Sequence, residues 1–442
     1  RICLRLWEVV LLSFCIQLGM VPLLAFYFHR VSLSGPASNV PAILLTTLIV
    51  PLGFLSLGTS YIWSGLGAFI SKGVSLLVGW LLASMRWFSQ MPHTSWRIPG
   101  PPYWFLALFL IFLMALAAVA WSAAQQRHER GRVLDNASKR RNAVEWLMLA
   151  AFLALAVGVA THPLRPDLPK GKLEATVLDV GQGDSIFISF PDGRTMLIDG
   201  GGAPGAERVG GYQSGIDIGE QVVSPYLWSR GIKKLDVVLL SHAHHDHIDG
   251  LRAVLNNFHV GELWVGRDEN ATAYRELLAQ AVTHHVRIVH EKQGDNFDWD
   301  GVQGQILWPE NATEAPAAAN NDSVVLRLKD QKIRFLLSGD IERQVETAIT
   351  QEHEPLAADF LKVPHHGSKT SSTEAFLDAV NPRVAVISVG EGNSYGLPDA
   401  EIVDRYRSKA IELLRTDQDG AVTASTGGRT LAVRVFVRPV TN

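Results

Sequence analysis

The chain has 442 residues, which is too long for a single hydrophobic core and predicts at least two units. Residues 1–160 contain 12 Lys and Arg against four acidic residues, whereas the remainder contains 28 against 39, so the halves carry about +8 and −11. Cys3 and Cys15 are the only cysteines and lie in or beside the first apolar stretch, which excludes a disulfide framework or a thiolate metal site in the second half.

Five apolar stretches in the first half are long enough to cross a membrane as helices. They lie near 6–28, 39–58, 63–85, 103–121 and 143–160. The third contains Lys72 with many Gly and Ser, so an amphipathic helix in the membrane interface is an alternative there. We expect residues 1–160 to form an α-helical transmembrane bundle among membrane lipids, and residues 161–171 to form a proline-containing linker. Because the chain starts at Arg1 without a signal-peptide pattern, we expect a longer parent protein.

The loop at 122–142 is strongly basic and sets the predicted orientation in the membrane. It contains Arg127, Arg130, Arg132, Lys139, Arg140 and Arg141. Loops rich in Lys and Arg stay on the cytoplasmic side, so the last apolar stretch then leads everything after Thr161 to the outer side. The sequence therefore predicts a multi-pass protein of the cytoplasmic (inner) membrane whose second half is extracytoplasmic.

From Leu173 onward, short β-branched strands alternate with helical stretches, which is typical of an α/β fold. The apolar strand 237–240 runs directly into Ser-His-Ala-His-His-Asp-His at 241–247. Imidazoles two residues apart at a strand end project the same way, which makes His242 and His244 candidate ligands of one metal. Asp246 and His247 can reach a second metal about 3.5–4 Å away.

Further ligand candidates follow other strands in chain order. Asp340 follows the apolar run 335–337 and is placed to bridge two metals, and His365 and His366 follow 360–363. Asp199 ends the strand 196–198 and is expected beneath the site, where it accepts the second N–H of a ligand histidine. This nitrogen and oxygen set predicts one or two divalent metal ions, zinc or manganese.

Catalytic roles are assigned to Asp246, His365 and His366; whichever of the two histidines is not a ligand would protonate a leaving group or hold a substrate oxygen. Ser368 and Lys369 are candidates for substrate contact, although an exposed lysine is commonly only a solvated surface residue. The carboxylates of the sequence DVGQGD, Asp179 and Asp184, either support the site or cap a glycine turn.

The series LIDGG, SHAHHDHIDG, SGD and PHHGS resembles the metallo-β-lactamase superfamily across 172–442, which implies an αββα sandwich with metals at one sheet edge. More narrowly, LDVGQGDS, NNDSVVLRL, LKVPHHGSKTS and TDQDGAVTAST resemble the ComEC family of bacterial competence proteins that internalise DNA. FYFHRVSLSGPASNVPAILLTTLIVPLGF resembles the end of that family's channel region.

Two positions depart from the superfamily pattern. A histidine expected about nineteen residues before the bridging aspartate is replaced by a turn containing Asn321, so the first metal would be weak or completed by Asn321 and water. A Gly-His-Pro sequence after an Asn-rich turn is replaced by Gly-Leu-Pro, and Leu397 cannot transfer a proton.

The resemblance implies DNA uptake in natural transformation, with metal-dependent phosphodiester hydrolysis degrading one strand while the other passes a channel, and other competence proteins as partners. A charge of about −11 on residues 161–442 opposes general DNA binding and requires a local basic patch, the metals or a missing portion. The alternatives are an extracytoplasmic phosphodiesterase or choline-phosphate esterase, and a non-enzymatic, metal-stabilised channel scaffold.

Overall fold

A computed structural model describes residues 2–91, 94–130, 136–202, 217–310, 320–352 and 356–437. The chain divides into two compact units, residues 1–165 and 166–442, each with its own packing. The side chains of the basic residues in the expected cytoplasmic loop, and the backbone of residues 131–135, lie outside the described part.

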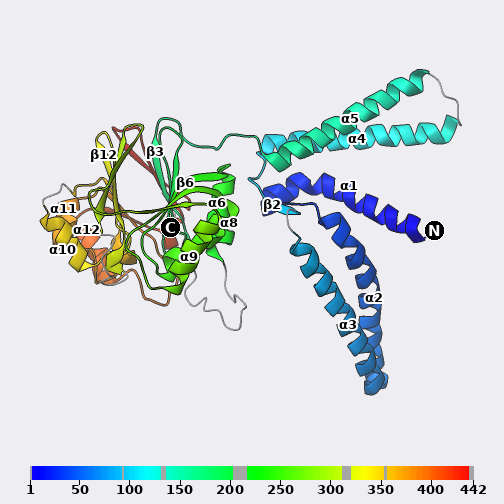
Figure 1. The fold of residues 1–442 in the computed structure, drawn as a ribbon, viewed down its shortest axis with the longest axis horizontal. Coiled ribbons are helices and arrows are strands. Elements are labelled where there is room, and N and C mark those ends of the chain that lie inside the picture. The colour runs from blue at the N-terminus through cyan, green and yellow to red at the C-terminus, as the bar shows by residue number, and fades with distance from the viewer. Residues whose placement is uncertain are drawn as a thin grey trace, which may run out of the picture. The chain divides into compact units, whose positions relative to one another are not determined.

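The first unit is built of long helices (Figure 1). In chain order its elements are α1 (Ile2–Phe28), β1 (Arg30–Ser32), α2 (Gly35–Ile62), α3 (Ser64–Ser89), β2 (Ser95–Arg97), α4 (Tyr103–Arg130) and α5 (Asn136–Thr161). β1 and β2 form a short antiparallel ladder that joins the residues after α1 to those before α4. At the tip of the α2–α3 hairpin, the hydroxyl of Ser56 donates to the carbonyl of Gly67, 2.9 Å away.

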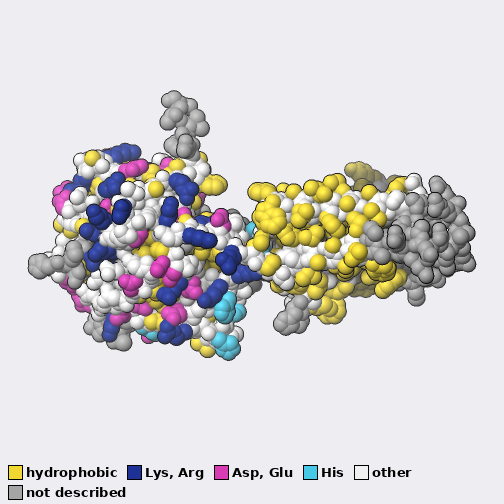
Figure 2. Space-filling model, turned by 90° about the horizontal axis from the view of Figure 1, so that it is seen from above, with side chains coloured by type: hydrophobic (Ala, Val, Ile, Leu, Met, Phe, Trp, Pro, Cys, Tyr) yellow, Lys and Arg dark blue, Asp and Glu magenta, His cyan; other side chains and the backbone are white. Residues whose placement is uncertain are grey.

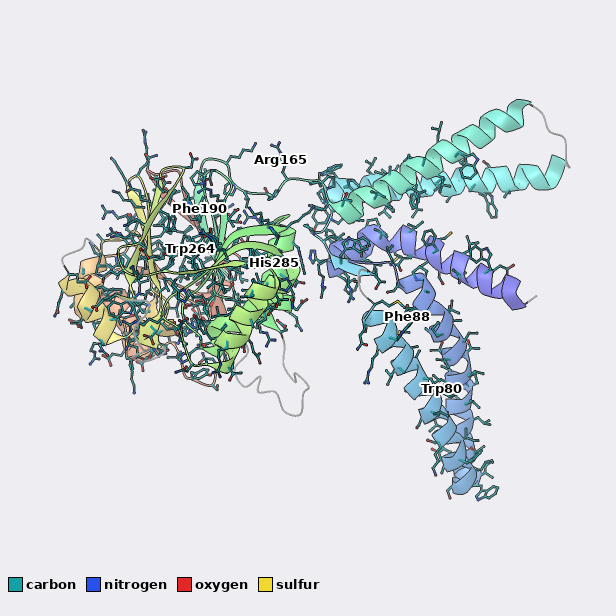
Figure 3. The ribbon with its side chains drawn as sticks, in the orientation of Figure 1. Trp80, Phe88, Arg165, Phe190, Trp264 and His285 are labelled. Atoms are coloured by element: carbon teal, nitrogen blue, oxygen red, sulfur yellow. The ribbon has the colours of Figure 1, made fainter. Side chains whose placement is uncertain are left out.

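Four of these helices contain stretches long and apolar enough to cross a membrane: Val10–Phe28, Gly35–Ile62, Ser64–Ser89 and Tyr103–Ser122. Their surfaces are largely hydrophobic, whereas the surface of the second unit mixes basic and acidic side chains (Figure 2). Trp80 on α3 is 56% exposed, as a side chain facing lipid would be (Figure 3). Within α5 the described apolar stretch, Trp146–Thr161, is shorter, so the fifth span stays a prediction.

The fourth expected span, 103–121, agrees with the candidate span Tyr103–Ser122, but the helices that carry the fourth and fifth apolar stretches extend beyond them. α4 continues to Arg130, beyond the expected limit of 121, and α5 begins at Asn136, before the expected start at 143. Polar residues such as Gln, Arg and Glu are good helix formers, so a helix does not end where its apolar stretch ends.

The second unit is a sandwich of two sheets (Figure 1). The eight-stranded sheet has the order β17 (Leu431–Val435), β16 (Val422–Thr426), β3 (Leu173–Val177), β4 (Ile186–Ser189), β5 (Thr195–Ile198), β6 (Lys234–Leu240), β7 (His259–Val265) and β8 (Arg287–His290). The seven-stranded sheet has the order β15 (Glu412–Arg415), β14 (Val384–Ile387), β13 (Phe360–Lys362), β12 (Ile333–Leu337), β11 (Val325–Asp330), β10 (Val302–Trp308) and β9 (Asn296–Trp299).

Helices cover the outer face of each sheet, so the layers run helix, sheet, sheet, helix. The helices on the eight-stranded sheet include α6 (Ser224–Ser229), α8 (Leu251–Asn257) and α9 (Thr272–Thr283), and those on the other sheet are α10 (Arg343–Gln351), α11 (Glu374–Val380) and α12 (Ala400–Ser408). Two short helices, α7 (His245–Ile248) and α13 (Thr416–Asp419), lie in loops. The expected order of apolar helices followed by an αββα sandwich is confirmed.

A core of buried apolar side chains lies between the two sheets. Phe190 follows β4 and contacts Trp299 of the opposite sheet, with ring centroids 4.6 Å apart, and Trp264 of β7 contacts Phe297 at 5.4 Å (Figure 3). Every residue of β3 is buried, because the sheet is covered on both faces.

The parallel strands determine where polar side chains gather. β5, β6, β7 and β8 are parallel neighbours in one sheet, and β12, β13, β14 and β15 are parallel neighbours in the other. The carboxyl ends of parallel strands meet at one sheet edge, and ligands bind outside those ends. The residues following β5, β6, β12, β13 and β14 therefore converge.

Candidate metal centre

Asp246, His247, Asp340 and His366 come together at this edge, with one ligand atom from each lying within 4.8 Å of the others. Asp340 Oδ2 lies 3.2 Å from Nε2 of both His247 and His366. Asp246 Oδ2 lies 3.4 Å from His366 Nε2 and 3.9 Å from His247 Nε2. Asp246 and His247 belong to α7, after β6, while Asp340 and His366 follow β12 and β13.

His366 and His365 have adjacent positions but opposite surroundings. The Nδ1 of His366 donates to the carbonyl of Ser388, 2.8 Å away, which turns Nε2 into the group. That Nε2 is buried and faces Asp340 and Asp246 at 3.2 and 3.4 Å without hydrogen-bond geometry to any described residue, as expected of an atom that would bind a metal. His365 faces away: its Nδ1 lies 3.2 Å from a carboxylate oxygen of Glu342. The structure thus brings His366 into the group and leaves His365 outside it.

A chain of hydrogen bonds behind His247 fixes its ring. Asp199, directly after β5, accepts from His247 Nδ1 at 2.8 Å and from the hydroxyl of Ser241 at 2.6 Å. The backbone N–H of Ser241 also donates to Asp199, at 2.7 Å. Asp199 therefore occupies the supporting position expected from the sequence, with His247 Nε2 directed at the group.

Lys362 is fully buried behind the group, although it is the last residue of an apolar strand. Its ammonium forms an ion pair with Asp184 and lies 3.3 Å from Asp340 Oδ1 and 3.1 Å from the carbonyl of Gly339. The opposite carboxylate oxygen of Asp340, Oδ2, faces the histidines. Lys362 thus holds Asp340 in one orientation and neutralises part of the carboxylate charge.

The glycines of DVGQGD allow Asp184 to reach this position. Gly183 has φ +120°, and a Cβ placed there would lie 2.1 Å from the carbonyl oxygen of Asp246. The N–H of Asp184 donates to that same carbonyl at 3.1 Å. Asp179, in contrast, is exposed and accepts from the N–H of Gly181 as a turn cap. The two readings of this motif therefore apply to different residues: Asp184 supports the site and Asp179 caps the turn.

His242 and His244 lie beside the group but outside its closest set. The Nε2 of His242 is 3.1 Å from Nδ1 of His244, so these two nitrogens face a common point. The hydroxyls of Ser241 and Ser323 lie behind this pair, 3.1 and 3.3 Å from His242 Nδ1, on the side of the ring away from Nε2. Asn321 points elsewhere, because its side-chain oxygen accepts from the N–H of Glu342 at 2.9 Å.

The electrostatics of the metal-free centre are dominated by buried carboxylates. Burial lowers the pKa of His366, but the charges of Asp340 and Asp184 overcome this and raise it to about 10. Burial likewise opposes charge on His247, and the surrounding carboxylates raise its pKa well above the usual value. Burial and the charge of His247 lower the pKa of His242 well below its usual value. Without a metal, protons on His247 and His366 therefore balance the carboxylates.

The residues present fit a divalent ion. Zinc binds His nitrogen and Asp oxygen at about 2.0–2.2 Å, which places two tetrahedral ligand atoms about 3.4 Å apart. The ligand-atom distances of 3.2, 3.2, 3.4 and 3.9 Å in this group are close to that spacing. Two imidazoles and two carboxylates are equally acceptable to manganese or iron.

The remaining predicted residues lie outside the group of candidate metal ligands. Ser368 is half-buried and shares a hydrogen bond with Thr370, and Lys369 is exposed. Leu397 packs at the edge of the core beneath α12, so it takes no part in proton transfer. Sequence reasoning missed Ser241, Ser323 and Lys362. A lysine interrupting a buried apolar strand just before PHHGS was the signal for Lys362.

Residues 178–391 match the metallo-beta-lactamase superfamily and residues 2–123 match the family described as competence protein. The chain joins a competence-protein domain to a metallo-β-lactamase domain. It is 30% identical to ComE operon protein 3 of Bacillus subtilis, covering 94% of this chain and 51% of that protein. It is 31% identical to competence protein ComA of Neisseria gonorrhoeae, covering 64% of this chain and 35% of that protein.

The chain thus spans about half the length of the first of these relatives and about a third of the second. The solved metallo-β-lactamase-fold protein YhfI of Bacillus subtilis is 12% identical, with a TM-score of 0.35, covering 55% of this chain and 95% of that one. That score carries no inference about activity. The apolar helices and the competence match together indicate a protein of the inner membrane.

Proposed function

We propose that the second unit is a metal-dependent phosphodiesterase that cleaves DNA during natural transformation, acting on the strand that is not transported. The proposal places the unit on the outer side of the cytoplasmic membrane, with one DNA strand passing a channel that includes the helical unit. The observation that carries it is the group of Asp246, His247, Asp340 and His366 in a chain that also contains a competence domain. Other competence proteins are the expected partners.

In this proposal each side chain has a defined task. Asp246, His247, Asp340 and His366 would hold the metal, which when bound would lower the pKa of a water toward neutrality and neutralise charge on the phosphate oxygens. Asp199 orients His247, and Lys362 orients Asp340. His365 stands at the edge, where Glu342 faces its Nδ1 and the amide of Asn320 lies 3.5 Å from its Nε2, and its ring is assigned the exchange of a proton with the leaving oxygen.

An esterase acting on choline phosphate requires an aromatic cage for the quaternary ammonium group. The groove beside the centre is lined by nine residues, none of them aromatic. A non-enzymatic scaffold remains the alternative that an activity measurement separates from the hydrolase.

The test is hydrolysis of single-stranded DNA by the full chain in detergent with added manganese or zinc. Asp246→Ala and Asp340→Ala should abolish metal-dependent cleavage. Asp192→Ala is the matched control, because this exposed carboxylate lies in the β4–β5 turn, at the end of β5 opposite Asp199. A folded, metal-loaded chain that leaves DNA intact would reject the nuclease and favour the scaffold.

A further inference from the structure

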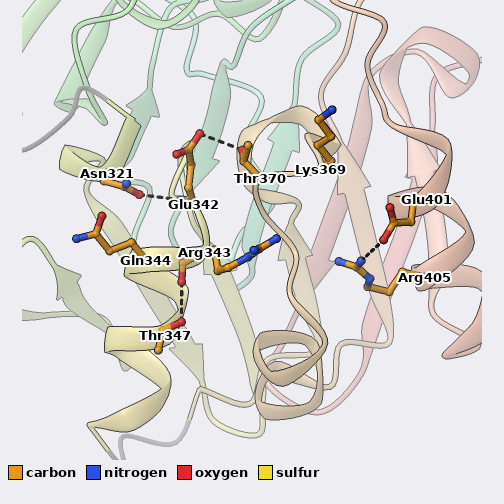
Figure 4. Close-up of a pocket in the computed structure, with 9 residues that line it drawn as sticks. All are labelled: Asn321, Glu342, Arg343, Gln344, Thr347, Lys369, Thr370, Glu401 and Arg405. Carbon is orange, nitrogen blue, oxygen red and sulfur yellow. Dashed lines mark hydrogen bonds and ion pairs between the residues drawn. The ribbon is translucent and has the colours of Figure 1, made fainter.

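A groove of about 890 Å³ opens beside the metal centre (Figure 4). Its walls come from α10, the segment 368–372 and α12. The lining residues are Asn321, Glu342, Arg343, Gln344, Thr347, Lys369, Thr370, Glu401 and Arg405. The question is which of these charges are available to a ligand.

The two carboxylates of the groove are engaged by the protein. Glu342 accepts from the hydroxyl of Thr370 at 2.9 Å and from the amide of Asn320 at 3.2 Å. Glu401 pairs with Arg405 at 2.8 Å, and Arg405 also donates to the carbonyl of Ser372 at 2.7 Å. Their charges are thus already balanced or hydrogen-bonded within the groove.

Two cations remain. Arg343 and Lys369 are exposed, and neither side chain forms an ion pair or hydrogen bond with any residue that the structure describes. Figure 4 shows Arg343 extending from α10 toward the segment that carries Lys369. Because Arg405 pairs with Glu401 while Glu342 keeps its charge, the groove has three cations against two carboxylates, a net charge of about +1 on a unit whose overall charge is negative.

The groove is continuous with the centre along two segments of chain. Glu342 lines the groove two residues after Asp340 of the centre, and Lys369 follows His366 by three. Two residues span at most about 7 Å. His365, which contacts Glu342, stands between the two sites.

We propose that this groove binds the backbone of single-stranded DNA, with Arg343 and Lys369 each contacting one phosphate, next to the phosphodiester held at the metal centre. The inference rests on the proposed function and names the local basic patch that a negatively charged nuclease requires. The polar lining fits a nucleic-acid backbone and offers no apolar wall for the acyl chains of a phospholipid, the other source of a phosphodiester.

The test is equilibrium binding of a fluorescent oligothymidylate to the full chain in neutral detergent with EDTA, which prevents cleavage. Arg343→Ala and Lys369→Ala should each weaken binding and lower the slope of log K against log salt by about 0.7, and the double variant by about 1.4. Phosphatidylglycerol added to the micelles should not displace the oligonucleotide. With metal present, the same variants should raise KM for hydrolysis while kcat stays within about twofold.

Lys332→Ala and Arg383→Ala are matched controls, because these exposed residues precede β12 and β14, at the strand ends opposite the centre. An unchanged slope in the double variant, or displacement by phosphatidylglycerol, would overturn the groove while leaving the nuclease in place. If the unsubstituted chain does not bind the oligonucleotide, DNA binding by the groove is rejected as well. Only an absence of DNA cleavage would reject the proposed nuclease function.

Discussion

In the metal centre, Asp184, Asp199, Asp340 and Lys362 are buried and each faces a charged or polar partner. In the adjoining groove, Arg343 and Lys369 are exposed without an ion-pair partner among the described residues. The centre is thus organised before any ligand arrives, whereas the groove can attract a polyanion only through charge that salt screens. At one sheet edge, therefore, the buried residues assigned to hydrolysis and the exposed cations assigned to DNA binding lie only a few residues apart in the chain.

The largest expected effect tests whether the buried cation of Lys362 stabilises the carboxylates of the metal centre. Lys362→Met should destabilise the second unit by about 3–5 kcal/mol, because it leaves Asp184 and Asp340 buried without their cation. Thermal unfolding of the full chain in detergent measures this loss. Added manganese should restore more of the transition temperature in the variant than in the unsubstituted chain.

Lys332→Met supplies the control, since Lys332 is exposed and its loss should change the free energy of unfolding by less than about 0.5 kcal/mol. Equal stability of Lys362→Met and Lys332→Met would show that the centre does not depend on its buried cation.

The next effect locates the boundary between centre and groove. His366→Ala should lower metal affinity more than about 100-fold, beyond the loss typical of residues that only support a ligand. His365→Ala should keep the metal content and lose cleavage, because its ring lies outside the group. The metal content after dialysis and the cleavage rate, measured together, distinguish the two variants. Equal metal loss in both would show that His365 also belongs to the metal centre.

The smallest effect concerns proton linkage, which should be present in the centre and absent from the groove. Since the pKa of His366 is raised to about 10 in the metal-free protein, the ring is protonated at neutral pH and a metal must displace that proton. Because the pKa of His247 is raised as well, metal affinity should fall by up to about 100-fold for each pH unit of acidification around neutral pH, and binding should release about two protons. Calorimetry in buffers of different ionisation enthalpy measures the release; a pH-independent affinity between pH 6 and 9 would contradict it.

Much of the architecture was predictable because the strand pattern and the order of polar strand ends are local properties of the sequence. The run before His242, the apolar strand before Asp340 and the one before PHHGS each coincide with a parallel strand, so convergence at one edge followed. The helix ends at Arg130 and Asn136 were not predictable from apolar stretches, since polar helix formers extend them.

The side-chain arrangement inside the centre depends on packing between segments far apart in the chain. Sequence could not decide between His365 and His366, because the choice is made by the carbonyl of Ser388, directly after β14. Nor could it separate Asp184 from Asp179, since only the close approach of Gly183 to the Asp246 loop does so. Asn321 was a reasonable candidate ligand by position, but its side chain caps the backbone at Glu342.

The pairing of β3 with β16 has a consequence for how the protein is made. β3 is the first strand of the second unit, yet its neighbour in the sheet is β16, from Val422 to Thr426, near the end of the described chain. During synthesis β3 must wait for roughly the whole of this unit to leave the ribosome, and its open edge invites pairing with other chains meanwhile. A chain truncated before β16 would therefore lose more than its last hairpin. It would expose β3 as an unpaired edge strand, which favours aggregation and proteolysis.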